Sequence, residues 1–329
     1  MLQVAANALA LGVLTACLLV WARIASKLKL HEPLVPAEPR RPVPWTGWDV
    51  ALLVLCWLSA DLGAAAIATQ FGPAEPVVPP AAAAPATPNS PAPHPVLLLI
   101  QGAPNGVTLA VCLLTAVVLA PLVEEFLFRL LLQGWLERTE TRPAGLVAGN
   151  EPSADQLETA EVAPVRRFPL SLWLPAAIFA LFHVRSGAET AAPEKIIRFL
   201  LASAVARSLL LILGVAWLKL RPDQRATIGS TPASWSDLGI VPEKFGSDVR
   251  LGLAGLAAVI VPVLGLQAAL NHLLSDTEIA PDPVPLFFLA LALGYLYRQT
   301  HRIVPAVVLH AGLNATTLVA AWLTTVAGE

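Results

Sequence analysis

The sequence predicts an all-α, polytopic membrane protein, a transmembrane bundle of about eight helices. Of its 329 residues, 56% are hydrophobic and only 13% are charged, whereas a soluble domain carries about 25% charged residues. Its apolar residues form runs that reach the roughly 20 residues a helix needs to cross a bilayer. Its Lys and Arg residues gather in alternate loops between these runs. Lipid is therefore expected to surround most of the chain.

Eight apolar stretches are candidates for the helices. The fourth and the seventh are short, so the count stays open between about six and nine. The stretches cover residues 4–22, 48–69, 107–133, 170–184, 196–218, 250–272, 284–298 and 303–325.

The distribution of basic residues supports this count independently. Lys and Arg are frequent in the first, third and fifth loops and present in the seventh; the second and sixth have none and the fourth has few. Because basic residues favour the cytoplasmic side of short loops, the alternation predicts eight helices with both termini outside the cytoplasm. A cleaved signal peptide in place of the first helix is disfavoured, since its basic residues follow the apolar run.

We divide the chain into two parts. Residues 1–95 form an N-terminal pair of transmembrane helices joined to a Pro/Ala-rich loop. Residues 96–329 form the main membrane core, which contains a polar insertion at 139–168 and an atypical helical segment at 195–275. The insertion is acidic and rich in Ala, Gly and Pro, a composition typical of solvated segments.

Several function classes are excluded or disfavoured by composition and motifs. The formal net charge of -2 and the absence of a basic face disfavour nucleic-acid binding. The three cysteines have no spacing typical of a disulfide framework or a zinc knuckle. The HExxH, GxSxG, P-loop and GxGxxG patterns are all absent.

The most informative motif is an apolar helix that contains Glu124, Glu125 and Arg129. Glu125 and Arg129 are four residues apart, so they share a helix face and are expected to form an ion pair. Glu124 points about 100° away and has no partner on its own helix. An unpaired buried carboxylate is costly, and such a group suits general acid or base chemistry. The alternative is a structural cluster of all three charges.

Two further motifs place polar side chains at the ends or on one face of apolar runs. His183 closes the run Phe179-Ala-Leu-Phe-His183, where an interfacial or core role is the alternative to chemistry. His310 and Asn314 are four residues apart and project from one helix face, as a catalytic or an interhelical hydrogen-bonding pair would.

Two lone charges, Asp61 and Arg207, also fall inside predicted helices. Charged groups within a membrane need a partner or a cavity. Because no motif surrounds either residue, we interpret them as a structural ion pair or as residues that face a cavity.

Taken in order, these motifs resemble the CPBP family of intramembrane proteases. That family includes CAAX prenyl endopeptidases and bacteriocin-processing or immunity proteins, and its pattern is EExxxR, then FxxxH, then HxxxN. The chain matches it from Glu124 to Arg129, from Phe179 to His183 and from His310 to Asn314. The segment LGYLYRQTHRIVPAVVLHAGLN, residues 293–314, is similar to the family's last two helices.

The resemblance implies an intramembrane endopeptidase that hydrolyses a membrane-associated protein or peptide substrate without a covalent intermediate. It implies that Glu124 activates water with help from His183, and that His310 and Asn314 stabilise the oxyanion. Glu125 and Arg129 would hold the site together. Family members are described as glutamate-dependent proteases and as metalloproteases, and Glu124, His183 and His310 are ligands that zinc can accept. The bacterial cytoplasmic membrane is the location that this family implies.

One departure from the family pattern and two other functions are left open. A long interval with a basic loop and the apolar run 250–272 separates His183 from His310. A segment like Ser236 to Ile240 usually precedes the EExxxR helix in the family, so the helix order can differ here. A non-enzymatic membrane scaffold or immunity protein would keep the motif residues for structural reasons. A proton-coupled transporter agrees less well with the sequence, because no inverted repeat stands out in it.

Overall fold

A computed structural model describes residues 2–39, 42–70, 96, 99, 100, 105–140, 169–183, 193–222, 231–274 and 283–327. The secondary structure of these residues is helical, with no strand among them. The predicted Pro/Ala-rich tract and all but the first two residues of the polar insertion lie outside the described residues.

The eight predicted helices are all present. Six are long and apolar enough to cross a membrane within the described residues, and the helix that ends near His183 is a shorter apolar one. The all-α polytopic prediction is therefore confirmed. The helices are α1 (Leu2–Lys29), α2 (Gly47–Gln70), the continuous run from α4 to α6 (Gly106–Glu140), α8 (Leu170–Phe182), α9 (Pro193–Leu220), α11 (Phe245–Leu273), α12 (Pro283–Thr300) and α13 (Val304–Ala327).

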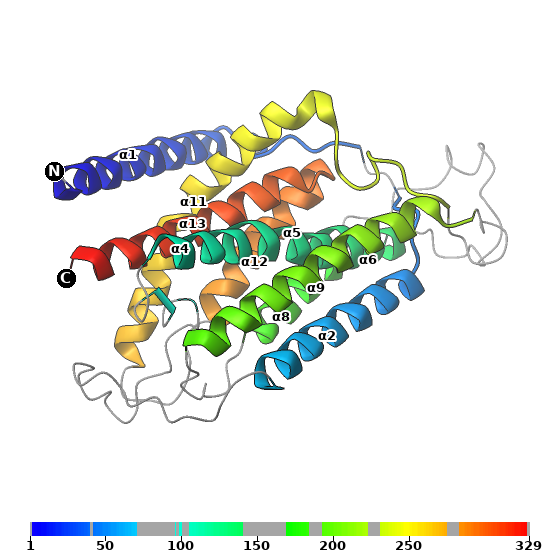
Figure 1. Ribbon diagram of the computed structural model, residues 1–329. Helices are drawn as coiled ribbons and strands as arrows, with labels where there is room; N and C mark the ends of the chain where they lie inside the picture. The colour runs from blue at the N-terminus through cyan, green and yellow to red at the C-terminus, as the bar shows by residue number, and fades with distance from the viewer. Residues whose placement is uncertain are drawn as a thin grey trace.

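The run from Gly106 to Glu140 crosses the middle of the bundle (Figure 1). It changes helix type along its length. Two π-helical stretches, η1 (Leu113–Leu119) and η2 (Phe126–Gln133), alternate with α4 (Gly106–Cys112), α5 (Ala120–Glu125) and α6 (Gly134–Glu140). π-Helical turns are rare and often occur at functional sites. Here they lie on both sides of the helical turn that contains the Glu124-Glu125 pair.

Three close helix pairs surround this central run: α2 with α9, α8 with α12, and α11 with α13. Helix α1 lies against α11 at one edge, and the two chain ends lie at the same end of the bundle (Figure 1). Large apolar side chains such as Leu62 and Leu213 remain exposed on outward faces, as expected where lipid replaces water.

Small residues let α11 and α13 approach closely. A Cβ at Gly252 of α11 would lie 2.7 Å from the carbonyl oxygen of Pro305 and 2.6 Å from the Cβ of Val308. Both atoms belong to the rigid part of the neighbouring helix, so rotation of a side chain cannot relieve the contact. Gly265, farther along α11, has no such neighbour within 4 Å.

We therefore expect Gly252→Ala to lower the free energy of unfolding by about 1–3 kcal/mol through overpacking. Gly265→Ala, the matched control on the same helix, should not lower it. Thermal unfolding of the two purified variants in one detergent measures the difference. Equal unfolding temperatures would contradict the close packing of α11 on α13.

Candidate active site

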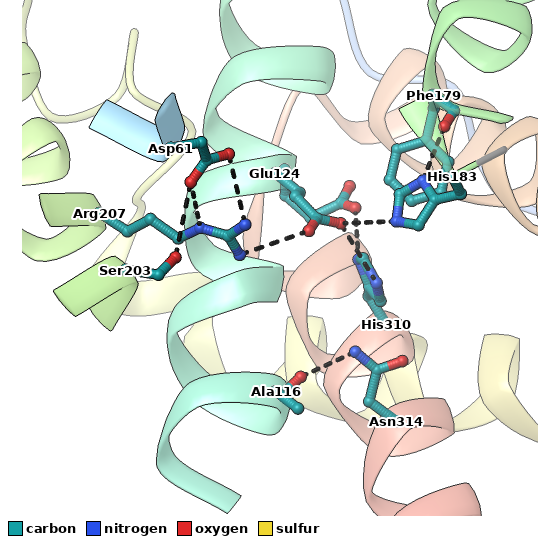
Figure 2. Close-up of polar contacts among 10 residues, drawn as sticks. Asp61, Ala116, Glu124, Phe179, His183, Ser203, Arg207, His310 and Asn314 are labelled. Carbon is teal, nitrogen blue, oxygen red and sulfur yellow. Dashed lines mark hydrogen bonds and ion pairs between the residues drawn. The ribbon is translucent and has the colours of Figure 1, made fainter. Parts of the chain in front are cut away.

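The two adjacent acids of α5 have different surroundings. The side chain of Glu124 is 11% exposed and that of Glu125 is fully buried. Neighbouring residues of a helix point about 100° apart, so the two carboxylates reach different partners. Side chains from three other helices lie close to Glu124, namely His183, Arg207 and His310 (Figure 2). A fourth helix, α2, contributes Asp61, which pairs with Arg207.

Glu124 lies at the centre of the site, and its two carboxylate oxygens face opposite sides (Figure 2). Oε2 is 3.9 Å from Nε2 of His183 and 3.8 Å from Nε2 of His310. Oε1 is 3.9 Å from a guanidinium nitrogen of Arg207. The predicted acid and the two predicted histidines are thus brought together.

The other ring nitrogen of each histidine is already engaged. Nδ1 of His183, at the C-terminal end of α8, donates to the carbonyl oxygen of Phe179 at 2.7 Å. Nδ1 of His310 donates to Oε1 of Glu125 at 2.9 Å. Because a carbonyl and a carboxylate only accept, both Nδ1 atoms carry hydrogen. In its neutral form each ring therefore presents an unprotonated Nε2 to Glu124.

The predicted ion pair between Glu125 and Arg129 is present, with Nε and Oε2 at 3.3 Å and both side chains fully buried. The guanidinium also lies over the ring of Phe179, 5.7 Å from its centre. Glu125 thus joins Arg129 to His310 and fixes the direction of that imidazole. The FxxxH motif contributes twice, because Phe179 both stacks in the core and accepts the hydrogen bond from His183.

Asn314 is not in direct contact with Glu124. Its Nδ2 donates to the carbonyl oxygen of Ala116 in η1 at 2.8 Å. In the π-helical pattern, in which Ala120 N–H bonds to Thr115 O, the next donor to Ala116 would be Pro121, which has no N–H. The side chain of Asn314 replaces this missing backbone donor and ties α13 to the central run.

Sequence reasoning did not include Arg207 in the site, although it identified Arg207 and Asp61 as charges inside predicted helices. The two side chains do pair with each other, at 3.3 Å between Nε and Oδ1. The additional contact of Arg207 with Glu124 joins positions far apart in the sequence, so it depends on tertiary packing. The only sequence signal was the cost of a charge in an apolar helix.

The residues present do not fit a metal ion in this arrangement. Two imidazoles and a carboxylate have the donor chemistry that zinc accepts. Among the described residues, however, no group of three His, Cys, Asp or Glu side chains is arranged to hold a metal. The guanidinium of Arg207 also lies against Glu124, where it competes with a dication for the carboxylate.

The fold is that of a polytopic helical membrane protein, and an acid and two imidazoles converge in its interior. Such a group of side chains is a candidate hydrolytic site. The model of one family, type II CAAX prenyl endopeptidase Rce1-like, matches residues 106–221 and 243–316, more than half of the chain. The chain belongs to this family of membrane proteases. No curated protein and no solved structure shows a significant match.

The family match bears on the helices between His183 and His310. It covers α9 from Pro193 and the whole of α11 from Phe245, in chain order with the motif helices. It does not extend to α1 or α2. The intervening helices therefore belong to the family region, and α2 adds to that region from outside it.

The Glu125–Arg129 pair yields a stability prediction. Arg129→Met leaves the Glu125 carboxylate buried beside His310 without its cation, and we expect a loss of about 3–5 kcal/mol in the free energy of unfolding. The double variant Glu125→Gln with Arg129→Met removes both charges and keeps an acceptor for His310. It should recover a large part of the loss.

Denaturant unfolding of the purified variants measures these changes. The matched control is Arg250→Met, which removes an exposed arginine of α11. A single Arg129→Met variant as stable as this control would contradict the structural role of the pair.

Proposed function

We propose that the chain is an intramembrane endopeptidase in which Glu124 activates the attacking water. The observation that carries this proposal is the convergence of Oε2 of Glu124 with Nε2 of His183 and Nε2 of His310. All three atoms face one small volume at distances near 4 Å. These gaps are too wide for direct hydrogen bonds but suit a bridging water.

Hydrogen-bond capacity limits how such a water can bind. A carboxylate and two neutral Nε2 atoms are three acceptors, whereas one water has two hydrogens to donate. Full satisfaction of the site therefore requires one of the three groups to carry a proton. The surrounding charges favour an imidazolium, because three carboxylates (Asp61, Glu124, Glu125) stand against the two guanidinium groups of Arg129 and Arg207.

These groups account for each proton of a peptide hydrolysis. Oε2 of Glu124 takes a proton as the water oxygen attacks the scissile carbonyl carbon. The imidazolium of His310, held by Glu125, donates through Nε2 to the developing oxyanion. Glu124, assisted by His183, then passes the proton to the leaving amine as the C–N bond breaks. The His310 imidazolium keeps its proton, and the proton left on the new carboxylic acid passes to the amine, so the products are a carboxylate and an ammonium group, with no covalent intermediate on the protein.

Asn314 is proposed to stabilise the oxyanion, but its amide is already partly engaged with Ala116. One N–H of its amide is committed to the Ala116 carbonyl, which leaves the other for the oxyanion. The position of this amide is set by the π-helical stretch η1 and by Pro121. Asn314 therefore links the shape of the central helix to the polar face of α13 that also bears His310.

An apolar pocket beside the site supports a membrane-associated substrate. A cavity of about 320 Å³ lies between α2, the central run and α8, lined by apolar side chains such as Trp57, Phe128 and Phe182. Phe128 packs edge-on against Phe179, which stacks against His183. A hydrocarbon chain in this pocket would hold its peptide near Glu124. A prenylated C-terminal peptide, as the family name implies, and an apolar peptide segment both fit this chemistry.

We place the activity in the bacterial cytoplasmic membrane, as a multi-pass protein whose partners are the bilayer and its peptide substrate. The non-enzymatic alternative, a scaffold or immunity protein, requires the polar cluster only for stability. It does not account for a carboxylate oxygen and two imidazole nitrogens that face one another without direct hydrogen bonds.

Glu124→Gln keeps the size of the side chain and removes the base, so we expect kcat to fall by about 100- to 10,000-fold with little change in folded yield. The assay uses purified protein in liposomes with two peptide probes, one with a farnesylated C-terminal CAAX sequence and one with an apolar membrane anchor. Product is measured by mass spectrometry. Cleavage of either probe by the unmodified protein identifies its substrate class.

Glu137→Gln is the matched control, because Glu137 is a buried acid of the same central run about 20 Å along the helix from Glu124. It should retain the activity per folded molecule. Full turnover by Glu124→Gln would overturn the proposed mechanism. A folded, unmodified protein that cleaves neither probe would favour the scaffold alternative.

A further inference from the structure

Arg207 and Asp61 form a two-point contact between α9 and α2. Nε of Arg207 donates to Oδ1 of Asp61 at 3.3 Å, and a terminal guanidinium nitrogen donates to Oδ2 at 3.5 Å. Ser203, one turn before Arg207 on α9, donates from its hydroxyl to Oδ1 at 3.5 Å. Asp61 is therefore held by two residues of one face of α9, and it fixes the plane of the guanidinium.

Both residues lie within membrane-spanning segments. Asp61 belongs to the span Gly47–Ile67 and Arg207 to the span Ile196–Leu220. Charges at such positions are costly and in most cases functional. A pair needed only to join α2 and α9 could be replaced by apolar packing at no loss of stability. The presence of this pair calls for a role that apolar side chains do not supply.

The remaining guanidinium nitrogen of Arg207 is directed at Glu124. It lies 3.9 Å from Oε1 (Figure 2). Because Oε1 faces Arg207, the rotation of the carboxylate leaves Oε2 between the two imidazoles of His183 and His310. Without the cation, the carboxylate could rotate or take the proton of the neighbouring imidazolium, and Glu124 would no longer face the bound water as a base.

We propose that Arg207 and Asp61 are positioning residues of the active site, which orient the Glu124 carboxylate through the chain Asp61–Arg207–Glu124. This inference rests on the proposed function of Glu124 as the base. It gives α2, which lies outside the residues matched by the family, a role in the reaction through Arg207 and Glu124. Helix α2 then supports the catalytic centre in addition to spanning the membrane.

The same two helices provide an internal control. Asp49 of α2 and Arg221, which follows α9, form a second ion pair at 2.6 Å. The indole N–H of Trp217 also donates to the Asp49 carboxylate. This pair lies at the other end of α2, about 18 Å along the helix from Asp61. It holds α2 against α9 and makes no contact with the catalytic cluster. Its loss tests what helix packing alone contributes.

Steady-state kinetics and thermal unfolding of variants in liposomes test the proposal. We expect Arg207→Gln to lower kcat at least 30-fold with less than a threefold change in KM. Arg207→Lys keeps the positive charge and should recover most of the loss. Asp61→Asn, which loosens Arg207 without removing it, should lower kcat by about threefold to tenfold. Arg221→Gln should lower the unfolding temperature and leave kcat per folded molecule unchanged.

A charge exchange separates positioning from packing. The double variant Asp61→Arg with Arg207→Asp restores an ion pair between α2 and α9 but places a carboxylate beside Glu124. We expect it to stay as inactive as Arg207→Gln. Recovery of kcat in the exchange variant would overturn the proposal, as would equal loss of kcat in Arg207→Gln and Arg221→Gln.

The failure of this inference is distinct from the failure of the proposed function. If Glu124→Gln is inactive while Arg207→Gln and Asp61→Asn keep the unmodified kcat, Glu124 remains the base and the positioning chain is wrong. If Glu124→Gln is itself active, the base assignment fails whatever Arg207 does. If Arg207→Gln does not fold, the kcat values of Arg207→Lys and Asp61→Asn still test the proposal. A lower kcat in Asp61→Asn together with near-normal kcat in Arg207→Lys supports it, and an unmodified kcat in Asp61→Asn contradicts it.

Discussion

The cost of charge inside a membrane governs the interior of this protein. A carboxylate away from water needs a cation or hydrogen-bond donors close to it. The central helix carries two such carboxylates in sequence, and each is balanced differently. Glu125 is balanced from its own helix by Arg129. Glu124 is balanced from another helix by Arg207, whose charge is in turn shared with Asp61. The positions of several helices follow from these two requirements.

This division of partners gives the two acids separate functions. The Glu125 carboxylate is fully committed, to Arg129 on one oxygen and to His310 on the other. Glu124 meets its neighbours only at distances near 4 Å. A committed carboxylate can orient a ring but has little freedom to exchange protons. A loosely held carboxylate beside the Nε2 atoms of two imidazoles has that freedom. In the proposed mechanism, the same residue type one position apart acts as a support at Glu125 and as a base at Glu124.

Local physics explains what the sequence predicted well. Long apolar runs and alternating loop charges defined the helices, and the spacing of four residues defined the Glu125–Arg129 pair. Contacts between segments that are distant in the sequence could not be predicted in this way. The sequence showed that Arg207 lies in an apolar helix, but its approach to Glu124 depends on how α9 packs. The hydrogen bond from Asn314 to the Ala116 carbonyl depends on a π-helical turn, and no side-chain periodicity indicates that.

The central claim is that Glu124 delivers water directly to the peptide carbonyl. Cleavage in water enriched in oxygen-18, with hydroxylamine present as a competing nucleophile, tests it most directly. The account predicts one heavy oxygen in the new carboxylate of every N-terminal product and no hydroxamate, because no acyl intermediate forms on the protein. Accumulation of a hydroxamate, or of a covalent adduct detected by mass spectrometry, would contradict it.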